Sequence, residues 1–132
     1  MNNSQLEISK HVDDRGELIA IDNLGSIPFE IARLFFIQKY NSNETRGNHA
    51  HLKCQQYLII LNGSVEIFLN NGSTEICHKL DSSDNTLYVP PLHWLVQKNA
   101  SDNLQLLVLA SDKYDENDYI SSLKEFIRIT NE

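Results

Sequence analysis

The stretch that decides the fold is "RGNHAHLKCQQYLIILNG", which runs from Arg46 to Gly63. Two histidines, His49 and His51, stand one residue apart, and an apolar run follows them. Side chains two positions apart in an extended segment share a face. His49 and His51 would then point together into the protein, with Ala50 pointing away. The alternative is a loop that exposes both imidazoles to water, but the adjoining core strand favours a site.

Working outward, the chain reads as short strands separated by turn residues. The stretch "QYLIILNGSVEIFLNNG" (56–72) predicts a β-hairpin, with Asn62-Gly63 as a type I′ turn because both residue types tolerate positive φ. About eight strands at roughly ten-residue spacing favour an antiparallel all-β barrel or sandwich. The other predicted strands are "GELIAID" (16–22), "IARLFFIQKY" (31–40), "STEICHKL" (73–80), "TLYV" (86–89), "LHWLVQ" (92–97) and "LQLLVLA" (104–110).

The C-terminal segment has a different pattern. In "DENDYISSLKEFIRIT" (115–130), apolar side chains recur at helical spacing, which predicts one amphipathic helix packed on the barrel. The acidic residues that precede it are expected to be solvated, because carboxylates are favoured near the positive end of a helix dipole. With no linker or repeat, the sequence predicts a single domain over residues 1–132. The apolar positions are Tyr119, Ile120, Leu123, Phe126 and Ile127.

Composition excludes several classes of function. The chain has 132 residues, 41% hydrophobic and 22% charged, and a formal net charge of -7. No basic stripe suggests a nucleic-acid partner, and no apolar run approaches the roughly 20 residues that cross a bilayer. The first residues show no apolar leader, so a cytoplasmic location is expected. Cys54 and Cys77 are then expected to be reduced thiols.

The histidine spacing resembles the first motif of the cupin superfamily, in which HxH is followed by an acid and a glycine. His49 and His51 fit this frame, but Gln56 occupies the position of the acid. In the second cupin motif, which begins at Pro90, the histidine position falls on Leu95. Two of the four usual metal ligands are therefore absent.

A catalytic metal site normally needs three protein ligands and one open position. A neutral amide is a weak ligand and leucine is none, so the sequence predicts no metal ion and no other cofactor. His93 lies two residues from the expected histidine position and would share its face on a strand, so it stays open as a ligand. Histidines without a metal are expected to move protons.

Four stretches together resemble the nucleotide-sugar 3,4-ketoisomerase (WxcM-like) family of the cupin superfamily, over nearly the whole chain. The resemblance implies an antiparallel cupin jelly-roll barrel that is metal-free and homodimeric. It also implies isomerisation of a dTDP-linked 4-keto-6-deoxy sugar, in making deoxyamino sugars for lipopolysaccharide and other surface polysaccharides. The stretches are "DDRGELIAID" (13–22), "RGNHAH" (46–51), "LYVPPLHW" (87–94) and "LVLASDKYDENDYI" (107–120).

The resemblance also implies roles for particular residues. His49 would be the base, and His51 would shuttle or orient a proton or hydrogen-bond the enediolate. Three arginines would hold the sugar or the diphosphate, since a guanidinium forks two hydrogen bonds onto phosphate. Trp94 could stack on thymine, although a core position is the commoner fate of a single tryptophan. The arginines are Arg15, Arg33 and Arg46, and Gln56 is expected to contact substrate.

Three residues depart from the family pattern. Phe36 stands where a tyrosine is common, Leu95 where a histidine or arginine is usual, and Asn48 where an aromatic residue usually precedes the histidine pair. The loss of a polar group at Leu95 keeps a second hypothesis open, a nucleotide-sugar-binding cupin with little turnover. A metal-dependent cupin enzyme is the third.

Overall fold

The computed structural model describes residues 5–38 and 43–132 of the chain, which divides into two compact units, Met1–Glu30 and Ile31–Glu132. In the first unit, β1 (Glu7–Asp13) and β2 (Gly16–Asp22) form an antiparallel hairpin, followed by the short 3-10 helix η1 (Leu24–Ser26). Both strands of the hairpin are largely exposed. Strand β2 confirms the strand predicted over residues 16–22.

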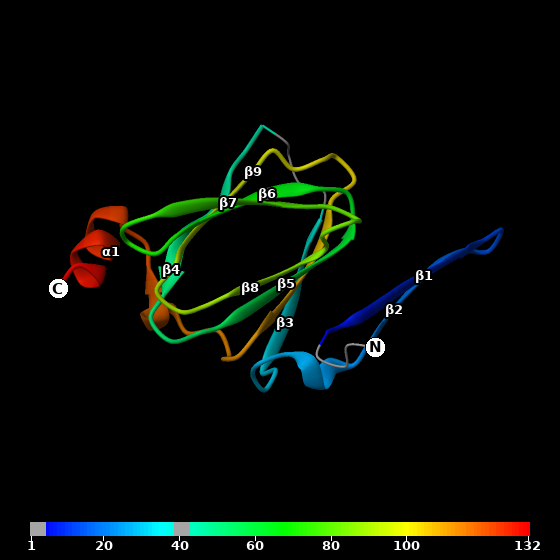
Figure 1. Cartoon of the computed structure of the whole chain (residues 1–132), viewed down its shortest axis with the longest axis horizontal. Coiled ribbons are helices and arrows are strands. Elements are labelled where there is room, and N and C mark those ends of the chain that lie inside the picture. The colour runs from blue at the N-terminus through cyan, green and yellow to red at the C-terminus, as the bar shows by residue number, and fades with distance from the viewer. Residues whose placement is uncertain (1–4, 39–42) are drawn as a thin grey trace. The chain divides into compact units, whose positions relative to one another are not determined.

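The second unit contains two antiparallel sheets, as Figure 1 shows. The first sheet has the order β3 (Arg33–Gln38), β10 (Gln105–Ala110), β5 (Gln56–Asn62) and β8 (Thr86–Val89). The second has the order β11 (Tyr119–Ile120), β4 (Arg46–His51), β9 (Trp94–Lys98), β6 (Val65–Asn70) and β7 (Glu75–Leu80). With one C-terminal helix, α1 (Leu123–Thr130), these antiparallel sheets confirm the predicted fold class, an antiparallel jelly-roll barrel with a C-terminal helix.

The main core lies between the two sheets. Strands turn successive side chains to opposite faces, so alternate apolar residues of β5 and β10 meet those of β6 and β9. Leu58 and Val108 belong to the first sheet, Ile67 and Leu95 to the second, and each is at most 4% exposed. This alternation was legible in the sequence, and it fixes which side chains can line the inside of the barrel.

A second, smaller core lies behind β4 and supports the histidine strand. Ala50, Trp94, Ile120 and Phe126 are all buried there, and the rings of Trp94 and Phe126 lie 5.8 Å apart. Helix α1 begins where the Ser122 hydroxyl accepts a hydrogen bond from the Glu125 backbone N–H. This cap satisfies a donor that the helix cannot use internally. Phe126 thereby comes to rest against the back of β4.

The hairpin predicted over residues 56–72 is wrong. Strand β5 pairs with β10 and β8, and β6 pairs with β7 and β9, so Asn62-Gly63 connects the two sheets. Only Gly63 has positive φ (80°), whereas a type I′ turn needs it at both positions. A Cβ at Gly63 would collide with Ser101 and Asn103. Close approach to that loop, and not hairpin formation, requires the glycine.

The helix predicted over residues 115–130 is shorter than expected. Its first part forms a 3-10 turn, η2 (Glu116–Asp118), and then β11, which pairs with β4. Backbone hydrogen bonding to an open sheet edge therefore overrides the helical periodicity at Tyr119 and Ile120. The other predicted strands have counterparts, although residues 39–40 of the segment 31–40 lie outside the described residues. No helix within the described ranges is long and apolar enough to cross a membrane.

Candidate active site

A cavity of about 240 Å³ opens between the two sheets of the second unit. Part of its wall is apolar and consists of side chains from β3, β5, β9 and β10. Its polar groups come from five strands. The apolar residues are Phe35, Ile37, Leu58, Leu95 and Val108. The polar residues are Arg33, Arg46, His49, Gln56, Gln97 and Tyr119.

His49 reaches this cavity because β4 contains a bulge. The β4–β9 register passes from Gly47 opposite Val96 to His49 opposite Leu95, which leaves Asn48 unpaired. Asn48 has a φ of 57°, in the left-handed region that asparagine tolerates better than most residues. A bulge changes the direction of neighbouring side chains, and here it accompanies a histidine in the cavity wall.

The backbone fixes the orientation of the His49 ring. Its Nδ1 lies 3.0 Å from the carbonyl oxygen of Gly47. A carbonyl oxygen only accepts hydrogen bonds, so Nδ1 carries the proton and Nε2 is left with a lone pair. Burial lowers the pKa of His49, the bond to Gly47 raises it, and the nearby His51 lowers it further. The net direction keeps His49 neutral near pH 7.

His51 lies on the same face of β4, as the two-residue spacing predicted. The two imidazole rings meet edge to face, with centroids 5.1 Å apart. The His51 side chain is only 10% exposed, and its Nδ1 lies 3.1 Å from Oδ2 of Asp118. Burial lowers the pKa of His51, and Asp118 acts in the opposite direction. The net direction again favours a neutral imidazole.

Tyr119 packs against both histidines. Its ring centroid lies 5.0 Å from that of His49 and 4.4 Å from that of His51. Strand β11 places it there, because Tyr119 pairs directly with His51 across the β4–β11 ladder. Tyr114 packs against Tyr119 in turn, with the two rings tilted and their centroids 5.7 Å apart. The tyrosine both lines the cavity and limits the movement of the two imidazoles.

The structure brings three of the predicted ligand contacts to this cavity. Arg46 and Arg33 line the cavity together with Gln56, which is 8% exposed. The Arg33 guanidinium lies over the rings of Phe35 and Tyr114, at 4.8 Å and 5.3 Å. Arg46 is exposed on β4, so its charge remains available to a ligand at the mouth.

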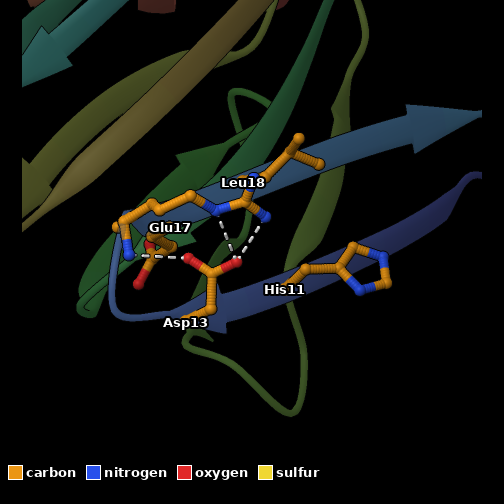
Figure 2. Close-up of a pocket in the computed structure, with 6 residues that line it drawn as sticks. His11, Asp13, Glu17 and Leu18 are labelled. Atoms are coloured by element: carbon orange, nitrogen blue, oxygen red, sulfur yellow. Dashed lines mark hydrogen bonds and ion pairs between the residues drawn. The ribbon is translucent and has the colours of Figure 1, made fainter.

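Arg15 belongs to the first unit, where it lies just before β2. Figure 2 shows the hydrogen bonds that the Asp13 carboxylate accepts there. Its backbone N–H donates to Oδ1 of Asp13, and its Nε and Nη2 donate to Oδ2 at 3.1 Å and 2.7 Å. This pairing lowers the pKa of Asp13. The arginine side chain is 88% exposed. A phosphate at Arg15 would have to compete with this carboxylate.

The structure also shows where three other residues considered in the sequence analysis lie: Trp94, Leu95 and His93. Trp94 is 7% exposed in the core behind β4 and is absent from the cavity wall, which favours the core alternative over stacking on a base. Leu95 lines the cavity as predicted from its place in the motif. His93 precedes β9 and pairs its Nδ1 with the carbonyl of Pro91, in a separate surface hollow that His78 also lines. His93 does not share the cavity of His49.

One group among the described residues has metal-binding donors within reach of a common point. The ligand atoms of His51, Cys54 and Asp118 lie within 4.8 Å of one another. Hydrogen bonds already occupy Nδ1 of His51, the Cys54 thiol and both Asp118 oxygens, since Asp118 accepts N–H groups and the thiol donates to the Gln55 carbonyl. His51, Cys54 and Asp118 therefore fit a hydrogen-bond network better than a metal site. In the cavity of His49, Leu95 offers no ligand atom. The absence of a metal stays a prediction.

Two residues of the site were missed from the sequence. The sequence pattern predicts a solvated helix start at Asp118 and helix packing for Tyr119, whereas Asp118 is 6% exposed and contacts His51. Both contacts join residues more than 60 positions apart, so no local periodicity could reveal them. The sequence contains a partial signal of the burial of Asp118. In an extended segment Asp118 would share a face with the apolar Ile120, two positions away.

Comparison with known proteins connects this geometry to a family. The model of the FdtA family (WxcM-like, C-terminal) matches residues 1–131. A TDP-4-oxo-6-deoxy-alpha-D-glucose-3,4-oxoisomerase from Aneurinibacillus thermoaerophilus is 40% identical over 126 residues, which cover 96% of this chain and 91% of the relative.

Solved structures agree with this match. A 3,4-ketoisomerase from Helicobacter canadensis is 41% identical with a TM-score of 0.82, covering 95% of this chain and 94% of that one. QdtA, a sugar 3,4-ketoisomerase from Thermoanaerobacterium thermosaccharolyticum in complex with TDP, is 37% identical with a TM-score of 0.82, covering 96% and 92%. A histidine-to-asparagine variant of QdtA was solved with TDP-4-keto-6-deoxyglucose. The chain therefore belongs to the FdtA-like sugar 3,4-ketoisomerase family, with its antiparallel cupin fold.

Proposed function

We propose that this chain converts a dTDP-4-keto-6-deoxyhexose to its 3-keto isomer by histidine-mediated proton transfer. The observation that carries the proposal is the state of His49 in the cavity wall. Its Nδ1 is engaged by the Gly47 carbonyl, so the basic Nε2 is the nitrogen left for a substrate. The names of the relatives supply the substrate class.

The reaction needs one proton removed and one returned. The C4 carbonyl acidifies the C3–H bond, and neutral His49 takes that proton while the electrons move to the C4 oxygen, giving an enediolate. The proton of the C3 hydroxyl then passes to the C4 oxygen, and the protonated His49 returns a proton to C4 as the C3 ketone forms. Atoms and electrons balance without an oxidant, and a group that titrates near working pH can act as base and then as acid.

His51 is the helper in this proposal. Its ring lies at 5.1 Å from that of His49, and it is more deeply buried. We assign it the movement or orientation of a proton between the two oxygens. Tyr119, which touches both rings, keeps this arrangement in place.

The cavity accommodates the sugar better than the whole ligand. At about 240 Å³ it is smaller than the roughly 300–1,000 Å³ of sites that enclose drug-sized molecules. We therefore place the hexose inside and the nucleotide at the mouth. There Arg46, with Arg33 deeper in the wall, would offset the charge of a diphosphate in a protein of net charge -7. Arg15 is a weaker candidate because Asp13 already occupies it.

Homodimerisation, a cytoplasmic location and a role in surface polysaccharide synthesis are parts of the same proposal, as is independence from any metal or other cofactor. Single-domain folding over residues 1–132 is also proposed. Neither a nucleic acid nor a membrane is among the expected partners.

The direct test combines binding with turnover. Calorimetry should detect binding of TDP that is weakened in Arg46→Ala, and NMR should detect a 3-keto product from TDP-4-keto-6-deoxyglucose. Binding without product would favour the nucleotide-sugar-binding alternative, for which the apolar Leu95 is the supporting observation. Loss of turnover with a chelator, restored by a metal, would favour a metal-dependent cupin. No binding of any thymidine nucleotide would contradict the proposal.

A further inference from the structure

Asp118 is a buried carboxylate whose two oxygens each accept hydrogen bonds from fixed donors. Oδ1 accepts from the backbone N–H of Lys53 at 2.8 Å, and Oδ2 accepts from that of Cys54 at 3.2 Å. Oδ2 also lies 3.1 Å from Nδ1 of His51. Its side chain is only 6% exposed. A carboxylate is seldom buried to this degree without such partners.

Backbone hydrogen bonds hold the segments that carry Asp118 and His51 next to each other. Tyr119 pairs with His51 across the β4–β11 ladder, and the Leu52 N–H donates to the Asp118 carbonyl at 2.9 Å. On the other side of β4, the His51 carbonyl accepts from the Leu92 N–H at 2.7 Å. Both ends of the contact between His51 and Asp118 therefore rest on main-chain bonds.

We propose that Asp118 is a positioning residue, which holds His51 in the tautomer protonated at Nδ1 and so reserves Nε2 for the proton transferred during isomerisation. An ionised carboxylate only accepts hydrogen bonds, so Nδ1 must be the donor. Among the described residues, Nε2 is buried and has no hydrogen-bond partner. The proposal rests on the proposed function and adds Asp118 to the residues that serve it.

The charges around His51 make this arrangement suited to a transient proton. Burial above all, and then Arg33, oppose the imidazolium of His51, whereas Asp118 and Asp112 favour it. His51 is thus neutral at rest. When Nε2 takes a proton, Nδ1–H stays with Asp118, whose negative charge offsets the new positive charge. The proton leaves again by Nε2, and Asp118 is never protonated.

The first test measures the tautomer in the wild-type protein. The ¹⁵N chemical shifts of His51 should show hydrogen on Nδ1 and a lone pair on Nε2 at neutral pH. The opposite tautomer would overturn the proposal, and this result does not depend on any variant or on turnover. If instead the wild-type protein fails to isomerise the sugar, the proposed function fails while the tautomer result stands.

The second test compares Asp118→Asn with Asp115→Asn. Asp115 lies three residues away and is exposed, and its side chain accepts the Asn117 N–H as the cap of η2, a role that asparagine fills equally well. Asp118→Asn should keep TDP binding and KM but lower kcat by about 10²-fold, within the worth of a positioned acid–base group. Because a negative charge is lost beside the His51 imidazole, the acidic limb of the pH profile should move to lower pH. Asp115→Asn should change neither kcat nor the position of the acidic limb. Wild-type kcat and an unmoved limb in Asp118→Asn would overturn the proposal.

Discussion

His49 and His51 share a face but differ in what supports each ring, a carbonyl for one and a carboxylate for the other. His49→Asn should keep the fold and TDP binding, because asparagine preserves part of the size and hydrogen bonding. Its kcat should fall by about 10²–10⁴-fold, the usual worth of a general base. The kcat of His51→Asn should fall by a smaller factor. Steady-state kinetics by NMR would measure both.

The matched control for these variants is His78→Asn. His78 lies on β7 of the same sheet and lines a separate surface hollow with His93. Its replacement should leave kcat unchanged. Equal kcat in His49→Asn and His78→Asn would mean that the histidine pair is structural.

The pH dependence follows from burial of the two imidazoles. Both have a pKa below the ordinary 6.5, with desolvation as the largest cause. A base must be neutral to accept a proton, so activity should persist below pH 6.5 and be lost as pH falls through the lowered pKa. The low-pH limb of kcat/KM should thus lie below that of an exposed histidine. A limb at or above pH 6.5 would contradict this account.

At the scale of elements, the β4 bulge is the feature on which the site depends. Gly47 has a φ of 88°, and a Cβ there would lie 2.7 Å from the Leu95 carbonyl oxygen and 2.9 Å from its Cδ2. Gly47→Ala should lower the free energy of unfolding by about 1–3 kcal/mol, the cost of a strained backbone position. It should also lower kcat, because the Gly47 carbonyl holds His49. Urea unfolding and kinetics would measure the two effects.

Gly25→Ala is the control for this substitution. A Cβ at Gly25 would meet no atom within 4 Å, and its φ lies outside the left-handed region. Its effect should stay within about 0.5 kcal/mol, as for other unconstrained surface changes. A Gly47→Ala protein as stable and active as Gly25→Ala would show that the bulge does not position His49.

Elements governed by local periodicity were predictable from sequence. The alternation in β6, the run of β10 and the shared face of His49 and His51 all follow from the two-residue period of a strand. Pairing partners were less predictable, because Asn62-Gly63 fits a hairpin turn as well as a crossing between sheets. Asp118 and Tyr119 were missed because their role depends on β11 joining β4, a contact between distant segments that competes with local helical spacing.

At the scale of the whole molecule, exposed apolar surface on an edge strand supports the predicted dimer. Strand β3 ends one sheet, and its outward residues Leu34 and Phe36 are each 56% exposed. Edge strands with apolar side chains invite pairing with another chain. Analytical ultracentrifugation should show twice the 15.1 kDa mass of the chain.

The variant for this prediction is Phe36→Lys, which places a charge on that edge and should shift the protein toward monomer. Glu75→Lys, on the exposed edge strand β7 of the other sheet, is the control and should leave the dimer intact. A wild-type protein that sediments only as a 15.1 kDa species at micromolar concentration would contradict the prediction.

The central claim is that this chain moves a proton on a TDP-linked keto sugar through a histidine base. The most direct measurement is NMR of TDP-4-keto-6-deoxyglucose incubated with the protein in D₂O. The account predicts a 3-keto product with deuterium at C4, deuterium at C3 of any 4-keto substrate that is re-formed, and a rate of incorporation at least about 10²-fold lower in His49→Asn. A sugar ring that stays free of deuterium while TDP binds, or equal incorporation by the wild type and His49→Asn, would contradict it.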